Sequence, residues 1–104
     1  MGSSERRKGV VWEQTVARWL RDRGYRVRRT GVAGQQDGDL VVDNLPYQLE
    51  CKNQKDQTAA IRDGLGQLTG PGVVVVKRRG KGPGDALAVM TLSDWLDAHE
   101  TVRD

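Results

Sequence analysis

The segment DLVVDNLPYQLECK, residues 39–52, decides the fold predicted for this chain. Residues 39–43 form a short apolar run that is typical of a strand, and residues 47–52 form a second one. Between them, residues 44–46 (Asn-Leu-Pro) have the composition of a turn. We therefore predict a β-hairpin over residues 39–52, with the rest of a sheet built around it.

The neighbouring segments predict further strands and helices on both sides of this hairpin. Helical spacing of apolar residues predicts a helix over residues 10–23, and Gly24 fits its C-terminal stop. The remaining predictions are a strand at 25–30, a loop at 31–38, a helix at 58–68, a central four-valine strand at 73–76, a loop at 78–84, a strand at 86–91 and a helix at 92–99. The predicted order, αβββαββα, is a small mixed α/β sheet flanked by helices.

Length and composition limit the class of protein. The 104 residues suffice for one compact domain, so we expect a single domain over residues 1–104, with residues 1–8 as a flexible basic segment. No run of about 18 apolar residues occurs, so we expect no membrane segment and a cytoplasmic location. The single cysteine, Cys51, excludes an internal disulfide, and one Cys with one His excludes a Cys/His zinc site.

The basic residues of the chain gather in clusters, although the formal net charge is only +3. They lie at residues 6–8, 18–29 and 77–81, whereas the acidic residues gather in the middle and at the C-terminus. Clustered arginines and lysines are typical of a surface that binds phosphates. A solvated basic face is the alternative, and charge alone does not decide between them.

The hairpin also brings together residues that can carry chemistry. Strand alternation puts Gln48, Glu50 and Lys52 on one face, with Leu49 and Cys51 turned toward the core. The turn brings Asp39 to the same end of the sheet as Glu50. Two carboxylates about 4 Å apart repel by roughly 4 kcal/mol at an effective dielectric near 20. Oxygen ligands gathered at that cost suit Mg²⁺ or Mn²⁺, and a lysine beside them can orient a water or offset negative charge.

Two acidic residues near this site leave alternatives open. Glu13 lies at the edge of the apolar stripe of the first helix, so it either joins the metal site or pairs with a nearby arginine. Asp37 competes with Asp39, which is preferred because it directly begins the apolar strand.

This ordered set resembles the PD-(D/E)xK nuclease superfamily. Asp39 and Glu50-Cys51-Lys52, preceded by a helix that bears Glu13, match its motif, and the likeness is greatest to the small archaeal and phage Holliday-junction resolvases. The basic residues 6–8 running into a helix are similar to the start of those enzymes, so the resemblance covers nearly the whole chain. It implies a restriction-endonuclease-like core and a metal-dependent, structure-selective endodeoxyribonuclease, cytoplasmic in a bacterial, archaeal or phage-infected cell.

The resemblance also implies roles for individual residues. Asp39 and Glu50 would bind Mg²⁺ or Mn²⁺ directly, the backbone carbonyl of Cys51 would be a third ligand, and Glu13 would join directly or through water. Lys52 would be the catalytic lysine, and Gln67 a supporting residue. The chain departs from the pattern in having Gly38 where the superfamily name expects proline. The loop 31–38 also lacks the serine that some archaeal resolvases carry, for which Thr30 is the possible substitute.

Several expectations concern DNA and a partner subunit. The residues expected to contact DNA are Arg6, Arg7, Lys8, Arg28, Lys55, Arg78, Arg79 and Lys81. Symmetric cutting of a four-way junction would require a homodimer. The three tryptophans at positions 12, 19 and 95 are expected in the core or a dimer contact, with stacking on DNA as the alternative. The alternative functions are a nuclease of the same fold with another DNA substrate, used in restriction, repair or packaging, a non-catalytic nucleic-acid-binding module, or an interaction protein.

Overall fold

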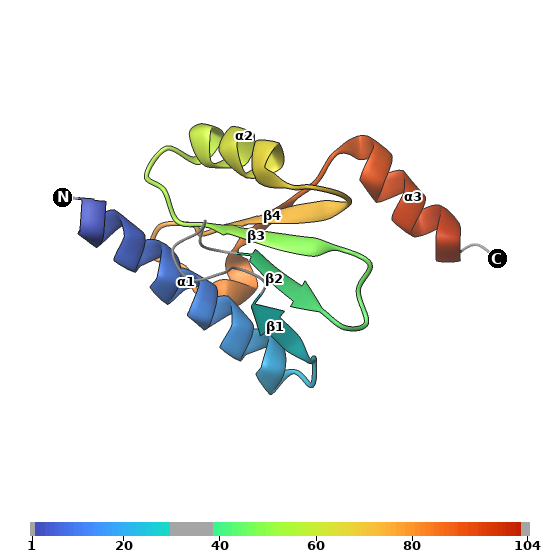
Figure 1. Ribbon diagram of the computed structural model, residues 1–104, viewed down its shortest axis with the longest axis horizontal. Coiled ribbons are helices and arrows are strands. Elements are labelled where there is room, and N and C mark those ends of the chain that lie inside the picture. Colours follow the sequence, from blue (N-terminus) through green and yellow to red (C-terminus); the bar gives the residue numbers. More distant parts are fainter. Residues whose placement is uncertain (1, 30–38, 103–104) are drawn as a thin grey trace.

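A computed structural model of the chain describes the backbone of residues 2–29 and 39–102 and the side chains of residues 7–29 and 40–99. Its elements are α1 (Gly2–Asp22), β1 (Val27–Arg29), β2 (Asp39–Val42), β3 (Gln48–Lys52), α2 (Gln57–Gln67), β4 (Gly72–Val76), the 3-10 turn η1 (Pro83–Asp85), β5 (Leu87–Val89) and α3 (Leu92–Val102). Figure 1 shows α1 and α2 packed on the sheet and α3 extending beyond it. The predicted mixed α/β sheet with flanking helices is confirmed.

The five strands form one sheet in the order β1-β2-β3-β4-β5. The pairs β1–β2, β2–β3 and β4–β5 are antiparallel, and β3–β4 is parallel. The predicted hairpin is the β2–β3 pair, and α2 makes the crossover that a parallel pair requires. The four-valine strand lies between β3 and β5, where burial on both faces suits it.

Helices α1 and α2 cover opposite faces of the sheet. Trp12 and Val16 of α1 pack with Leu49 and Cys51 of β3, so the predicted inward direction of these two β3 residues is confirmed. On the other face, Ala60 of α2 packs with valines of β4. Strand alternation therefore turns Glu50, which lies between Leu49 and Cys51, toward the α2 face.

Two details show how local sequence sets these elements. Gly24 has a left-handed φ of 95°, which ends α1 as predicted because glycine adopts this conformation without a steric penalty. In α2, an added Cβ on Gly64 would lie 2.5 Å from Val74 Cγ1. The glycine that weakens the helix by propensity is therefore what lets α2 approach β4 closely.

The first helix is longer than predicted. It begins at Gly2, so residues 2–8, predicted as a flexible basic segment, are helical instead. Glutamate, arginine and lysine are good helix formers, and this propensity extends the helix beyond its apolar stripe. Smaller differences are shorter strands at 27–29 and 87–89, a last helix that continues to residue 102, and the η1 turn at the end of the predicted loop, which extends it to residue 85. In the described part of the chain, none of the helices has the length and apolar character needed to span a bilayer.

Candidate active site

The register of the hairpin brings the predicted site positions together. Asp39 at the start of β2 lies directly opposite Glu50 of β3. Opposite positions in an antiparallel pair share one face, with Cβ atoms about 4.5–5.5 Å apart. The side chain of Asp39 lies outside the described residues, as do Thr30, Asp37 and Gly38. The expected convergence of Asp39 and Glu50 is thus present at the level of backbone pairing.

Glu50 and Lys52 form a largely buried ion pair. The Glu50 residue is 1% exposed, the Lys52 side chain is 12% exposed, and Lys52 Nζ lies 3.8 Å from Glu50 Oε2. At this separation the attraction is about 4 kcal/mol at an effective dielectric near 20, which offsets part of the cost of removing the carboxylate from water. The lysine side chain is the more exposed member of the pair.

Helix α2 covers the Glu50 face of the sheet. Glu50 pairs with Val74 in the β3–β4 register, and Gly64 of α2 packs against that valine. Gln67 follows one turn later, and its Oε1 atom is buried. This placement puts Gln67 on the sheet-facing side of α2, where a supporting role would require it.

Glu13 is buried as strongly as Glu50 and forms an ion pair with Arg29. The Glu13 side chain is 2% exposed, and its carboxylate contacts Arg29 Nε, whose side chain is 52% exposed. Arg29 pairs with Leu40, the residue that follows Asp39, so Glu13 lies near the beginning of β2. The arginine expected by the ion-pair alternative is therefore present. The metal-site alternative stays open, because Glu13 belongs to the helix on the sheet face opposite to Glu50 and the side chain of Asp39 lies outside the described residues.

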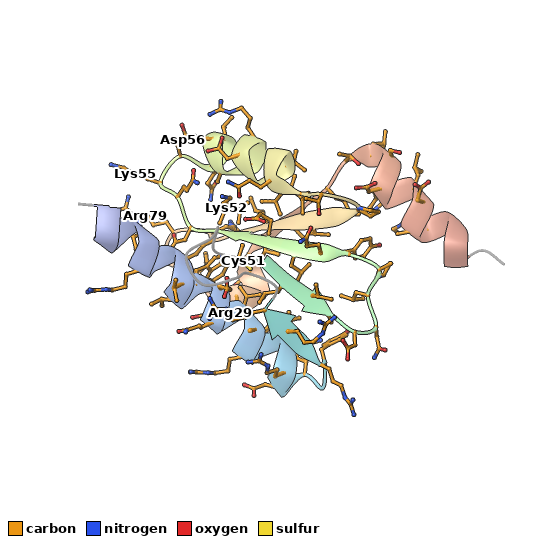
Figure 2. All side chains as sticks on the ribbon, viewed as in Figure 1. Arg29, Cys51, Lys52, Lys55, Asp56 and Arg79 are labelled. Carbon is orange, nitrogen blue, oxygen red and sulfur yellow. The ribbon has the colours of Figure 1, made fainter. Side chains whose placement is uncertain are left out.

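The described part of the chain also has a basic groove beside Lys52. Its volume is about 860 Å³, and it lies where the parallel strands β3 and β4 end and α2 begins. Its lining residues are Lys8, Asn53, Gln54, Lys55, Asp56, Gln57, Thr58, Lys77, Arg79 and Gly80. Figure 2 shows Lys52, Lys55, Asp56 and Arg79 at this end of the molecule. The one acidic residue of the lining, Asp56, caps α2 by accepting a hydrogen bond from the Ala59 N–H at 3.1 Å.

The groove contains only part of the predicted DNA-contact set. The groove is lined by three members of this set, Lys8, Lys55 and Arg79. Arg78 and Lys81 are exposed in the loop that carries Arg79 but do not line the groove. Arg28 lies on the β1 edge, 3.7 Å from Asp43, so it is not part of this surface. Two residues of the predicted DNA-contact set remain: Arg7 is exposed on α1, and the side chain of Arg6 lies outside the described residues.

Two other groups of cations belong to the basic clusters at 18–29 and 77–81 but are not among the residues expected to contact DNA. Lys77 lines the groove, and its Nζ donates to the carbonyls of Arg78 and Lys81 at 3.4 and 3.3 Å, which shapes the loop. The sequence feature that could have predicted this place for Lys77 is its position as the first residue after the four-valine strand. A second hollow of about 410 Å³ beside Glu13 is lined partly by Arg18 and Arg21, which are one helical turn apart.

The tryptophans occupy different environments. Trp12 is in the core, where its Nε1 donates to the Val75 carbonyl at 3.2 Å, and its ring lies 5.7 Å from Lys77 Nζ. Trp19 lies against Arg23, whose guanidinium carbon is 4.9 Å from its ring centre. Trp95 of α3 is 46% exposed. The expected core location is therefore confirmed for Trp12. The exposed Trp95 lies outside the core, so the expected dimer contact or DNA stacking of this residue stays a prediction.

The chemistry of the site follows from its donors. Side chains described in the structure form no group of three or more Asp, Glu, His or Cys, and Asp39 is not among those side chains. The carboxylate of Glu50 directly opposite the Asp39 position supplies the hard oxygen donors that Mg²⁺ or Mn²⁺ prefers. No family model matches this chain, and neither a curated protein nor a solved structure matches it.

Proposed function

We propose that this protein is a metal-dependent endodeoxyribonuclease that hydrolyses phosphodiester bonds in branched DNA, as a Holliday-junction resolvase does. The observation that carries the proposal is the buried Glu50–Lys52 pair, with Glu50 opposite Asp39, next to a basic groove. A buried carboxylate facing a second carboxylate position is costly, and a cation-dependent site explains why the fold retains it. The motif resemblance supports two further parts of the proposal: branched DNA as the substrate, and the cytoplasm of a bacterial, archaeal or phage-infected cell as the location.

The residues of the site have separate roles in this proposal. Asp39, Glu50 and the Cys51 carbonyl would hold Mg²⁺ or Mn²⁺, which when bound supplies a water activated for attack and stabilises the leaving oxygen. Lys52, whose ammonium lies 3.8 Å from Glu50, would offset negative charge that develops on the attacked phosphate. Glu13 would hold the nearby end of β2 through Arg29 or join the ligand set.

The groove supports contact with the DNA backbone. Lys8, Lys55, Lys77 and Arg79 contribute four cations, and none of its lining residues is aromatic. Such a lining suits phosphates and offers no platform for stacking bases, so recognition would depend on DNA shape more than on sequence. A resolvase makes two symmetric cuts, so the proposed enzyme acts as a homodimer.

Cleavage by matched variants tests this proposal. We expect Asp39→Asn, Glu50→Gln and Lys52→Met each to lower cleavage of a labelled four-way junction by at least about 100-fold while binding persists. Asp43→Asn is the control, because Asp43 lies at the other end of β2 and pairs with Arg28. Full activity in any of the three site variants would refute the assigned site.

The choice of substrate identifies the kind of nuclease. A four-way junction, a flap and a linear duplex with the same arm sequences should be compared under single-turnover conditions. Preference for the junction supports a resolvase, whereas preference for a flap or a duplex supports the same-fold alternative used in repair, restriction or packaging. Binding without cleavage of any substrate would support the non-catalytic module.

A further inference from the structure

The hollow beside Glu13 is separate from the basic groove. Its volume is about 410 Å³, and we call it the arginine hollow; it is lined by Glu13, Gln14, Ala17, Arg18, Arg21 and Asp22 of α1 and by Arg29 of β1. Figure 2 shows Arg29 apart from Lys55 and Arg79, which lie at the groove. The proposed function assigns no role to Arg18 or Arg21.

Two of the three arginines in the hollow are held in place by the protein. Arg21 donates from Nη2 to the Val27 carbonyl at 2.9 Å, and Arg29 contacts the buried carboxylate of Glu13 through Nε. A guanidinium has five N–H donors, so each contact engages only some of them. Side chains that are already held lose less conformational entropy when a ligand binds. The hollow therefore presents pre-oriented donors of the kind that bind phosphate oxygens in pairs.

Arg18 has no structural partner in the part of the chain that the structure describes. It is exposed, and it forms no ion pair with a described residue. The helix dipole favours Arg21 in the last turn of α1, but this effect does not extend to the turn before it. Like charges one turn apart destabilise a helix, so placing Arg18 beside Arg21 costs stability. An anion bound between the two side chains would offset this cost.

The charge of the hollow suits a phosphodiester. Three arginines stand against Glu13 and Asp22, which gives the lining a formal net charge of +1. Glu13 is buried against Arg29, so Asp22 is the one exposed carboxylate of this lining. A phosphate of a nucleic-acid backbone carries a single negative charge, which matches this balance better than the dianion of free phosphate does.

The hollow and the groove flank the candidate active site at one end of the sheet. Arg29 lies at the end of β1, Asp39 and Glu50 lie opposite each other on β2 and β3, and Lys77 of the groove directly follows β4. Neighbouring strands are about 4.8 Å apart, so β1 and β4 are separated by about 14 Å. Lys8 of the groove is on α1 with the arginines of the hollow, so the helix also connects the two sites.

We propose that the arginine hollow is a second phosphodiester-binding site, which holds the DNA strand on the β1 side of the active site while the groove holds it on the β4 side. This inference rests on the proposed function for its ligand, DNA. One strand of a duplex has a phosphate about every 3.4 Å, so a separation of about 14 Å corresponds to about four phosphates. Contacts on both sides would fix the strand across the Asp39–Glu50 pair.

Phosphate-ethylation interference with the full chain tests the proposal. A labelled four-way junction, sparsely ethylated, is bound in EDTA, and the bound and free fractions are compared. The wild type should show two groups of interfering phosphates, about four phosphates apart. Arg18→Ala should remove one group, and Lys55→Ala the other. Arg26→Ala is the matched control and should keep both groups, because Arg26 is an exposed arginine of the same basic cluster outside the hollow.

A second variant separates ligand binding from folding. Gln14→Glu adds a negative charge to the hollow, so it should remove the same group as Arg18→Ala. It also puts a glutamate four positions before Arg18, which stabilises a helix, so loss of fold would not explain the result.

The outcomes distinguish this inference from the proposed function. An unchanged pattern in both hollow variants, or the same loss in Arg26→Ala, would overturn the second site even if the wild type cleaves the junction in Mg²⁺. The expected pattern without cleavage in Mg²⁺ would overturn only the proposed function.

Discussion

The ion pair between Glu13 and Arg29 allows a quantitative prediction. The substitution Arg29→Ala would remove the guanidinium from Glu13, whose side chain is 2% exposed. Loss of one partner from a fully buried pair costs about 3–5 kcal/mol. Because the Arg29 side chain is 52% exposed, water screens part of the interaction, and we expect a loss of about 2 kcal/mol. For a domain of this size, that loss lowers Tm by roughly 8–16 °C.

A double-mutant cycle with Glu13→Gln measures this interaction. The neutral amide keeps the shape of the side chain and removes the charge, so Arg29→Ala should cost much less in the Glu13→Gln background. Urea unfolding, followed by tryptophan fluorescence, should give a coupling energy of at least about 1 kcal/mol. Strictly additive effects would refute the argument that a buried charge sets the cost.

The same variant separates the two roles of Glu13. Cleavage should be measured at a temperature where Glu13→Gln is fully folded. A loss of cleavage there assigns Glu13 to the active site, and full cleavage leaves it as the ion-pair partner of Arg29.

Three further predictions concern packing, metal binding and DNA binding. In urea unfolding, Gly64→Ala should be less stable than Gly66→Ala by about 1–3 kcal/mol. Of these two positions, only an added Cβ at 64 meets a neighbouring atom. Equal stabilities would contradict the close packing of α2. Mg²⁺ at tenfold its Kd should stabilise the wild type by about 1.4 kcal/mol, which corresponds to a rise in Tm of roughly 6–11 °C. The substitution Glu50→Gln should abolish this rise in Tm. An unchanged rise in the variant would exclude Glu50 as a ligand. Lys55→Ala should reduce the slope of log K against log salt for duplex binding by about 0.9. Arg62→Ala is the control, because Arg62 lies outside the groove, and it should leave the slope unchanged. Equal slopes for the two variants would show that the groove is not part of the DNA interface.

Local patterns in the sequence predicted much of the fold. The alternation around Glu50 predicted which β3 residues enter the core, because the period of a strand is a local property. Gly24 predicted the end of α1 for the same reason, since its left-handed backbone needs no distant contact. The hairpin turn then placed Asp39 opposite Glu50 without information from the rest of the chain.

Features that depend on distant contacts were not predictable in the same way. The partner of Trp12, the Val75 carbonyl, is 63 positions away in the sequence. The packing role of Gly64 depends on a valine from another element, whereas propensity marks the glycine only as a weak helix residue. The exposure of Trp95 likewise depends on where α3 lies, which the periodicity of that helix does not determine.

Cleavage of a four-way junction with and without Mg²⁺ tests the central claim most directly. Wild-type protein and Glu50→Gln should be incubated with the end-labelled junction in Mg²⁺ or in EDTA, and the products separated on a denaturing gel. We expect paired, symmetric nicks for the wild type in Mg²⁺ and intact strands in the other three reactions. Equal cleavage by Glu50→Gln, or an intact junction with the wild type in Mg²⁺, would contradict it.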